Sequence, residues 1–581
     1  MNLDTTSLHA LFKPKSIAII GASSDVKKIG GRAVHYLKKY GYSGKVYPIN
    51  PLNSEIQGIP AYHSILEVPE RIDLAVLAIP ANMVLEALEQ CAKKNVGSAI
   101  LFSAGFAETG EAGLKAQERV SNIAKENGIR LLGPNCMGFV NVADAAMGTF
   151  SLMFLKGLPK FSRIGFVSQS GALGAYIFSR GREIGMGFSY WISTGNEVDV
   201  QIAECIAFLA EDPNTDIIAV QAEGIKDGEK LKAALQIATE KCKPVVMLKT
   251  GTSVVGTRAV ASHTASMVGS DAVFDAMLKQ YGVYRVKTLR ELVEIPYTLS
   301  QVELPQGNRV CVFTNSGGVG IMLADDVTDL GLEMPQLSEE TQKKLLNLIP
   351  YAGVENPIDI TATIGTQPEL LKKFLELTLE EGIYDQFIIF LGYSGLQKDI
   401  ISMRLDLLEP VRDKYRHIPM LWANLFTDET RQLFANKGMP VFEDPLEAAK
   451  TAYALSFFAG KFRNQRPHKK LDISTVQEPD WPSGVDLTED AAKAILAKHN
   501  IPVTIEKTIV TEEDAIKIAK QIGFPVVLKG MSPDILHKTE AGIVYLNIYN
   551  EKEVSRAFKA IDKKIKQMKV RYNGISVQEM L

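Results

Sequence analysis

The chain has 581 residues, of which 46% are hydrophobic and 23% charged, and its formal net charge is −3. A chain of this length exceeds a single hydrophobic core and is expected to form about three to five domains. The near-balance of charge disfavours a nucleic-acid-binding protein, which typically has a basic surplus.

The five cysteines are far apart in the sequence and form no CxxC pair. This spacing is typical of reduced cytosolic thiols rather than of a disulfide framework or a zinc site. The sequence has no secretory signal pattern and no run of about 18 apolar residues. We therefore expect a cytoplasmic protein that is not inserted in a membrane.

Short β-branched segments alternate with helical patterns through the first 460 residues, which is typical of α/β domains with parallel sheets. Residues 1–145 contain five of these segments with helical patterns between them, and we interpret them as a Rossmann-like domain. The predicted strands lie at 16–23, 45–51, 73–80, 98–105 and 129–135.

Two later segments resemble each other. "IGFVSQSGALG" at 164–174 aligns without a gap with "VCVFTNSGGVG" at 310–320. In both, an apolar strand leads into two polar residues, a Ser-Gly pair and a small-residue helix start. The match predicts two flavodoxin-like domains, at 146–300 and 301–460. The alternative is that any parallel strand needs a tight turn with glycine.

The composition changes after residue 460. Residues 461–484 are polar, charged and punctuated by proline, which indicates a linker. A last α/β segment at 485–581 contains a predicted helix at 551–569 and ends in a predicted strand. One face of that helix has an apolar stripe formed by Val554, Phe558, Ile561, Ile565 and Met568.

The turn after the first strand, "AIIGASSDVKKIGG", combines glycine with small hydroxyl residues. Such a turn lets the backbone approach a phosphate at a helix N-terminus. The GxGxxG spacing and the carboxylate at the second strand end, both expected of an NAD site, are absent. CoA is therefore favoured over a nicotinamide cofactor. The candidate CoA-binding residues are Gly21, Ala22, Ser23, Ser24, Asn50, Pro51 and Pro80.

The two Ser-Gly turns are candidate phosphate sites because each starts a helix, whose N-terminus has about half a positive charge. If they converge, together they would balance much of the charge on a phosphoryl group. The candidate residues are Ser170, Gly171 and Ala172 in the first turn, and Ser316, Gly317 and Gly318 in the second.

His263 lies in "TRAVASHTASMVGSD" (257–271), a stretch without helical or strand periodicity. A neutral imidazole is a competent nucleophile near pH 7, so His263 is a candidate carrier of phosphate between two sites. Glu223, at a predicted strand end, is the candidate carboxylate that orients the imidazole. From residue chemistry alone, a solvated or helix-capping histidine explains the loop equally well.

The motifs together resemble the NDP-forming acyl-CoA synthetases, which include ADP-forming acetate–CoA ligase, and more distantly succinyl-CoA synthetase. "LGPNCMGFVN", "GFVSQSGAL", "SHTASMVGSD", "NSGGVG", "NPIDIT" and "GFPVVLK…ILHKTEAG" occur in the domain order of that family. The resemblance implies a CoA-binding domain, two flavodoxin-like ligase domains and part of an ATP-grasp domain.

The resemblance also implies roles for individual residues. His263 would be the transient phosphohistidine, assisted by Glu223, and Asn135 and Gly138 would lie near the carboxylate and thioester chemistry. In the ATP-grasp segment, the residues assigned by the resemblance are Lys529 (nucleotide phosphates), His537 (phosphate relay), and Gln578 and Glu579 (adenine hinge).

In the family, a second ATP-grasp lobe supplies the acidic Mg²⁺ ligands. We expect these ligands beyond Leu581 and none within the chain, so the chain is expected to come from a longer enzyme and to bind ATP poorly.

The leading hypothesis is a reversible ligase that makes acyl-CoA, ADP and phosphate from a carboxylic acid, CoA and ATP. Its expected partners are these small molecules and, as a homo-oligomer, further copies of the chain. The alternative is a non-catalytic regulatory protein that binds acyl-CoA or nucleotide, and a nicotinamide oxidoreductase is a third reading.

Overall fold

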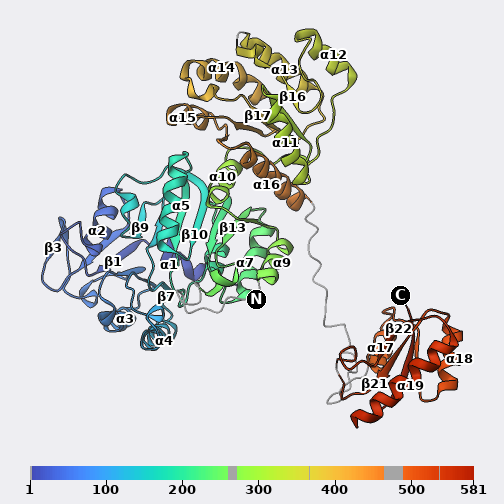
Figure 1. Ribbon diagram of the computed structural model, residues 1–581. Helices are drawn as coiled ribbons and strands as arrows, with labels where there is room; N and C mark the ends of the chain where they lie inside the picture. The colour runs from blue at the N-terminus through green and yellow to red at the C-terminus, as the bar shows by residue number, and fades with distance from the viewer. Residues whose placement is uncertain (1–2, 259–270, 366, 464–488, 536, 581) are drawn as a thin grey trace. The chain divides into compact units, whose positions relative to one another are not determined.

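The computed structural model describes residues 3–258, 271–365, 367–463, 489–535 and 537–580 (Figure 1). The chain forms two compact units, Met1–His468 and Lys469–Leu581. In the described ranges, three large sheets and one two-stranded sheet lie in the first unit, and a four-stranded sheet lies in the second. None of the helices in these described ranges has the length and apolar character needed to cross a membrane.

The first sheet is parallel, with the order β2-β1-β5-β6-β7. Its strands are β1 (Ser16–Ile20), β2 (Lys45–Ile49), β5 (Leu74–Leu77), β6 (Ser98–Leu101) and β7 (Arg130–Leu132). Its helices are α1 (His9–Phe12), α2 (Ile29–Lys39), α3 (Val84–Lys93) and α4 (Glu111–Glu126), and β3 (Glu55–Ile56) pairs with β4 (Ile59–Pro60). The five predicted strands are confirmed, since each apolar run forms a strand that is largely buried on both faces.

The second sheet has the order β14-β13-β12-β10-β11-β8-β9. Its strands are β8 (Gly138–Asn141), β9 (Ala146–Thr149), β10 (Phe161–Ser168), β11 (Phe188–Ser193), β12 (Ile217–Ala222), β13 (Val245–Lys249) and β14 (Val283–Val286). Its helices include α5 (Gly171–Glu183), α6 (Ile202–Glu211), α7 (Gly228–Glu240), α9 (Asp271–Gln280) and α10 (Leu289–Leu299).

The antiparallel pair β8–β9 extends the second sheet at the edge of β11. The domain boundary expected at residue 145 falls between these two strands. Strand pairing therefore begins the second sheet at Gly138, before the predicted start at residue 146. The reason is tertiary: β8 follows the first sheet in sequence, but its backbone groups pair with β11.

The third sheet is parallel, with the order β16-β15-β17-β18-β19. Its strands are β15 (Val310–Thr314), β16 (Ile358–Asp359), β17 (Gln386–Phe390), β18 (Met420–Ala423) and β19 (Val441–Phe442). Its helices are α11 (Gly317–Asp329), α12 (Glu339–Leu348), α13 (Pro368–Glu380), α14 (Lys398–Lys414), α15 (Asp428–Asn436) and α16 (Pro445–Arg463).

The two repeated motifs occupy the same place in their sheets. Each forms the first strand of a 2-1-3-4-5 order and the helix after it, namely β10–α5 and β15–α11. Helix α16 returns from the third sheet to contact α10, and a salt bridge of 2.9 Å joins Lys450 to Glu291. The flavodoxin-like arrangement is thus present twice.

The C-terminal unit has an antiparallel sheet in the order β20-β23-β21-β22. Its strands are β20 (Glu506–Ile509), β21 (Val526–Met531), β22 (Val544–Ile548) and β23 (Gly574–Glu579), and its helices are α17 (Glu489–Lys498), α18 (Glu512–Ile522) and α19 (Glu551–Met568). Four residues of the predicted stripe of α19 are buried in the core of this unit, while Met568 is exposed at the helix end (buried: Val554, Phe558, Ile561, Ile565).

Candidate functional site

The predicted CoA-binding residues lie at one edge of the first sheet. They follow the carboxyl ends of β1, β2 and β5, which are neighbours. Ser24, Pro51 and Pro80 are exposed there, so their surfaces are available to a ligand. Ligands of open α/β sheets bind at the carboxyl edge where the strand order reverses, and here it reverses beside β1.

Gly21 makes the turn after β1 possible. Its φ is +86°, and a Cβ at this position would lie 2.5 Å from the carbonyl oxygen of Ala78. The N–H groups of Gly21 and Ala22 donate to the Ile49 carbonyl oxygen at 3.1 and 3.2 Å. Helix α2 packs closely on this turn, since a Cβ on Gly30 would lie 2.0 Å from the Gly21 carbonyl oxygen. The turn therefore requires glycine.

Asn50 joins two of these turns. Its Nδ2 donates to the Ala22 carbonyl oxygen at 2.8 Å, and its Oδ1 accepts the N–H groups of Leu52 and Asn53 at 2.9 and 3.0 Å. The amide is thus engaged with the protein on both sides. Asn50 shapes the site, while the exposed Pro51 and Leu52 form its surface.

The first Ser-Gly turn is held by Gln221 on the neighbouring strand β12. Gln221 Oε1 accepts the Ser170 N–H at 3.2 Å and lies 2.7 Å from Ser168 Oγ. Ser170 caps α5 by accepting the Leu173 N–H on its Oγ at 3.3 Å. Such a helix start directs N–H groups, including those of Gly171 and Ala172, toward an anion.

Gln169 fixes the backbone that carries Glu223. Its Oε1 accepts the N–H groups of Glu223 and Gly224, and its Nε2 donates to the Gly224 carbonyl oxygen at 2.7 Å. The same Nε2 lies 2.9 Å from Glu197 Oε2. Glu223 is half-buried beside the Ser170 turn, so the structure brings these two predicted sites together.

Glu197 is a buried carboxylate that sequence reasoning missed, and it is only 3% exposed. Burial raises its pKa, and hydrogen bonds from Gln169, the Ile202 N–H and Thr194 oppose that rise. A buried carboxylate is expected to be hydrogen-bonded in this way. Its sequence signal is weak, because "STGNEVDV" has no periodic pattern that assigns Glu197 to the interior.

The "GPNCMG" loop covers the N-terminus of α5. A Cβ on Gly171 would lie 2.8 Å from Met137 Cγ, and the Met137 N–H donates to Ser193 Oγ at 3.2 Å. Asn135, with a φ of 56°, contacts Asn196 Oδ1 at 3.3 Å through Nδ2. Gly138 packs directly against the Gly148 carbonyl oxygen. The loop predicted to lie near the thioester thus borders the first Ser-Gly turn.

His263 lies outside the described residues. The flanking elements are described: Lys249 ends β13 and Asp271 begins α9, with Lys249 Nζ 3.9 Å from Asp271 Oδ1. Arg285 also binds both carboxylate oxygens of Asp271, at 2.8 and 2.9 Å. Burial lowers the pKa of Lys249, and Asp271 opposes the shift. These contacts hold the end of β13 close to the start of α9.

The second Ser-Gly turn resembles the first in its backbone but not in its surroundings. The Ser316 N–H donates to Thr314 Oγ1 at 2.9 Å, and a Cβ on Gly318 would meet no atom within 4 Å. A Cβ on Gly317 would lie 3.3 Å from Asp359 Oδ2. This carboxylate, from the "NPIDIT" motif, was not predicted as a site residue and opposes an anion at the turn.

The two Ser-Gly turns have separate neighbours in the described structure. The atoms nearest to Gly171 belong to Met137 and Ser193, and the atom nearest to Gly317 belongs to Asp359. The described contacts therefore do not join the two turns, and their convergence on one anion stays a prediction.

Lys529 belongs to a charged cluster on the sheet of the C-terminal unit. Its Nζ lies 2.8 Å from Glu489 Oε1, which also binds Lys493 Nζ at 3.0 Å. Lys538 Nζ lies 3.6 Å from Glu489 Oε2. The sequence pattern identified Lys529 but not Glu489, Lys493 or Lys538, because the four residues come from three separate segments, namely α17, β21 and the segment between β21 and β22.

The other ATP-grasp candidates have different surroundings. Gln578 is 9% exposed, and its Nε2 donates to Thr504 Oγ1 at 2.8 Å. Glu579 Oε1 accepts the Ile505 N–H at 2.8 Å, while its own N–H donates to the Ile505 carbonyl oxygen at 2.9 Å. His537 is exposed, next to Lys538. Within the described ranges, no three or more His, Cys, Asp or Glu side chains lie together as a metal site.

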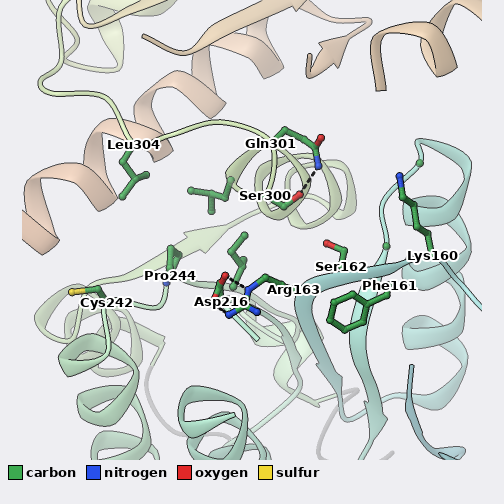
Figure 2. A pocket seen from close by; sticks show the side chains of 14 residues that line it. Lys160, Phe161, Ser162, Arg163, Asp216, Cys242, Pro244, Ser300, Gln301 and Leu304 are labelled. Atoms are coloured by element: carbon green, nitrogen blue, oxygen red, sulfur yellow. Dashed lines mark hydrogen bonds and ion pairs between the residues drawn. The ribbon is translucent and has the colours of Figure 1, made fainter. Parts of the chain in front are cut away.

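A cavity of about 510 Å³ lies at the opposite, amino edge of the second sheet (Figure 2). It is bounded by the starts of β10 and β12, with the Arg163–Asp216 ion pair on one side and Ser300 and Gln301 on the other. Since the predicted phosphate and CoA residues all follow carboxyl strand ends, this cavity is not part of the candidate site.

Three domain families match the chain. Residues 15–142 match a CoA binding domain, residues 162–299 a succinyl-CoA ligase like flavodoxin domain, and residues 483–581 an ATP-grasp domain. The matched ranges contain the Gly21 turn, the first Ser-Gly turn and Lys529.

Relatives match over nearly the full chain. Acetate–CoA ligase [ADP-forming] I of Archaeoglobus fulgidus is 32% identical over 99% of this chain and 83% of its own length. 4-Hydroxybutyrate–CoA ligase [ADP-forming] of Nitrosopumilus maritimus is 32% identical over 98% of this chain and 82% of its own length. The dinucleotide forming acetyl-coenzyme A synthetase 1 of Ca. Korarchaeum cryptofilum, solved with phosphate and ADP, is 28% identical with a TM-score of 0.71, covering 78% of this chain and 97% of that chain.

Proposed function

Because the chain belongs to the ADP-forming acyl-CoA ligases, we propose that it joins a carboxylic acid to CoA at the expense of ATP. Acid, CoA and ATP give acyl-CoA, ADP and phosphate, and the reaction is reversible. The observation that carries the proposal is the fixed arrangement of Glu223, Gln169 and the Ser170 turn, next to the "GPNCMG" loop.

The first step is phosphoryl transfer from ATP to His263. An imidazole nitrogen attacks the γ-phosphorus, the bond to the bridging oxygen breaks, and ADP leaves. Glu223 accepts a hydrogen bond from the other imidazole nitrogen and so favours the tautomer that attacks. Where the phosphoryl group is relayed, His537, beside Lys538, makes this attack on ATP first, and His263 then attacks the phosphorus bound to His537, which leaves as neutral imidazole.

The second step moves the phosphoryl group to the substrate. A carboxylate oxygen attacks the phosphorus of phosphohistidine, which releases neutral His263 and forms an acyl phosphate. The N–H groups of Gly171 and Ala172 at the start of α5 stabilise the charge on the phosphoryl oxygens. We assign a similar role to Ser316, Gly317 and Gly318.

The last step forms the thioester. The CoA sulfur attacks the carbonyl carbon, and phosphate leaves with the electrons of the carbon–oxygen bond. We propose that Gly21, Ala22, Ser23 and Ser24 bind CoA phosphates, with Asn50 maintaining the turn. Asn135 and Gly138 lie in the loop that borders the phosphate turn, where the carbonyl group would be held.

Lys529 binds the nucleotide phosphates, and Gln578 and Glu579 form part of the adenine pocket. We also propose that Mg²⁺ accompanies the nucleotide, where it would neutralise phosphate charge. The described residues contain no acidic cluster suited to it, so we assign no step to the ion.

The cellular setting and the acid are part of the same proposal. All five cysteines are free thiols, which fits the reducing cytoplasm. We propose a homo-oligomer, the commonest assembly of soluble enzymes. A small monocarboxylate is the proposed substrate class, since the two relatives are named for acetate and 4-hydroxybutyrate.

The test is the half-reaction from acyl-CoA. Incubation with acetyl-CoA and radioactive phosphate is expected to label the chain with an acid-labile, base-stable phosphoryl group. The label should be lost in His263→Ala and retained in Met267→Leu, a control in the same loop. If the wild type binds CoA tightly but neither it nor any variant is labelled, the chain is instead a non-catalytic acyl-CoA-binding regulator.

A further inference from the structure

Three lysines of the C-terminal unit converge on one carboxylate. We call Lys493, Lys529 and Lys538 the lysine cluster. Their Nζ atoms lie 3.0, 2.8 and 3.6 Å from carboxylate oxygens of Glu489. They come from three separate elements, namely α17, β21 and the segment between β21 and β22. Tertiary structure has therefore gathered three cations around one anion.

The cluster has more positive than negative charge. Lys493 also binds Glu506 Oε2 at 2.7 Å and Thr504 Oγ1 at 3.0 Å. For Lys529 and Lys538, the carboxylate within 4 Å is that of Glu489. Three ammonium groups thus face two carboxylates, and Glu489 is the carboxylate that all three lysines share.

Glu489 remains ionised at any pH relevant to the enzyme. Its partial burial raises the pKa, but hydrogen bonds and charges from Lys529 and Lys493 outweigh burial and lower the pKa to about 2. A carboxylate and a phosphate accept the same charge-assisted hydrogen bonds from an ammonium group. The two carboxylate oxygens of Glu489 therefore accept the same hydrogen bonds from the lysines that two oxygens of a phosphate group would accept.

Helix α17, which carries Glu489 at its first position, is weakly packed. None of its residues from Glu489 to Lys498 is buried. Helices α18 and α19 differ from α17, since both contribute buried side chains to the core of this unit. Ion pairs and hydrogen bonds from Glu489, Asp490 and Lys493 tie α17 to the sheet. Separating Glu489 from the lysine cluster would thus disturb little apolar packing.

We propose that Glu489 occupies the position of a nucleotide phosphate when no nucleotide is bound, and that nucleotide must displace it. The proposal rests on the proposed role of Lys529 in binding nucleotide phosphates. Glu489 then acts as an internal competitor that weakens binding and keeps the lysine cluster together between turnovers. The ligand that displaces it is a nucleoside di- or triphosphate.

The opposite role predicts the opposite result. If Glu489 only positioned the lysines for the ligand, removing its charge would let the ammonium groups separate and would weaken nucleotide binding. If it competes, removing its charge makes the cluster more positive and strengthens binding. The sign of the effect therefore distinguishes competition from positioning.

The test is titration of the whole chain with ADP, without a divalent metal, by calorimetry. Glu489→Gln is expected to bind ADP at least threefold more tightly than wild type, and the gain should shrink as salt is raised. Glu512→Gln is the matched control: Glu512 is also the first residue of its helix and pairs with Lys559 at 3.1 Å, but it lies on α18. This control should leave the affinity unchanged.

Unchanged or weaker ADP binding in Glu489→Gln overturns the proposal, as does an equal gain in Glu512→Gln. Lys529→Met should lose ADP binding. If it does not, or if no variant binds ADP, the nucleotide does not use this cluster and the inference fails. Labelling of His263 from acetyl-CoA does not involve these lysines, so the ligase proposal is judged independently.

Discussion

Single polar side chains determine the geometry of the candidate site. Gln169 makes hydrogen bonds to the backbone at Glu223 and Gly224 and to the carboxylate of Glu197. Asn50 has a similar role, since it bonds the backbone of Ala22 and Leu52. Neither side chain is left free for a ligand. Gln169 and Asn50 therefore hold the backbone of the site in place, and other residues are proposed to contact the substrate.

We predict that Gln169→Leu lowers the rate of His263 labelling from acetyl-CoA at least tenfold while the KM for acetyl-CoA changes little. Leucine has a similar volume but removes the hydrogen bonds that Gln169 makes with the N–H groups of Glu223 and Gly224 and with Glu197 Oε2. Each such loss costs about 1–3 kcal/mol, so the thermal midpoint should fall as well. Labelling kinetics and calorimetry measure the two effects.

The control is Gln236→Leu, since Gln236 Nε2 donates to Glu240 Oε1 at 2.9 Å within the same helix, α7. A fall in the thermal midpoint with an unchanged labelling rate per folded molecule would contradict a positioning role for Gln169.

At the scale of elements, identical local patterns lead to different environments. Helices α5 and α11 both follow a Ser-Gly turn. Only Ser170 forms a side-chain cap, and only Gly317 has a carboxylate, that of Asp359, beside its turn. Helix α10 shows a further case, because it contacts both α5 and α16 and carries the half-buried Glu294.

Burial raises the pKa of Glu294 to about 8, although Arg290 Nε lies 3.7 Å from its Oε1 and opposes the shift. Glu447, Arg431 and Glu443 also act on it. In the unfolded chain a glutamate has a pKa of about 4.3. Between these values the native state binds more protons than the unfolded state, so this group makes stability fall as pH rises from about 4.5 to 8.

We therefore predict that Glu294→Gln is more stable than wild type by about 2 kcal/mol or more at pH 8.5, since each pKa unit corresponds to about 1.4 kcal/mol. The difference should shrink to about 1 kcal/mol near pH 5 and disappear below about pH 4, where the unfolded chain is protonated as well. Thermal unfolding across this pH range measures the difference in stability. The control is Glu118→Gln, because Glu118 is an exposed residue of α4. A constant difference between Glu294→Gln and wild type at all pH values would disprove the buried, protonated carboxylate.

At the scale of the whole molecule, the chain divides into units that have their own cores. The sheet of the C-terminal unit encloses an apolar cluster that includes Val526, Leu528, Phe558 and Ile561. Residues of the first two sheets, by contrast, share one cluster, which joins Phe12 and Phe139. A unit with its own core is expected to fold by itself.

We predict that a chain ending at Arg463 folds, binds CoA with the affinity of the full chain, and is labelled by acetyl-CoA and phosphate. This fragment contains all the proposed CoA-binding residues, the residues of the first Ser-Gly turn and His263. Calorimetric titration with CoA and the labelling assay measure this. Loss of CoA binding in a soluble, folded fragment would show that the C-terminal unit supports the CoA site.

The sequence alone determined the strands, the helix-starting turns and their repetition. These features depend on short-range chemistry: apolar β-branched runs form buried strands, and Gly21 is needed where the backbone turns with positive φ. The family, and with it the proposed residue roles, followed from motifs in a fixed order. Gly171, Glu223 and Lys529 were all identifiable in this way.

Only the tertiary structure decided which polar groups meet. Gln169 and Glu223 are 54 positions apart, and Glu489 and Lys529 are 40 apart, yet each pair is in contact. Likewise, the contact of Asp359 with the second Ser-Gly turn and the pairing of β8 with the second sheet depend on tertiary structure. Strand order and side-chain direction bring distant segments together. A local sequence pattern specifies the backbone of its own element, but it does not specify which elements become its neighbours.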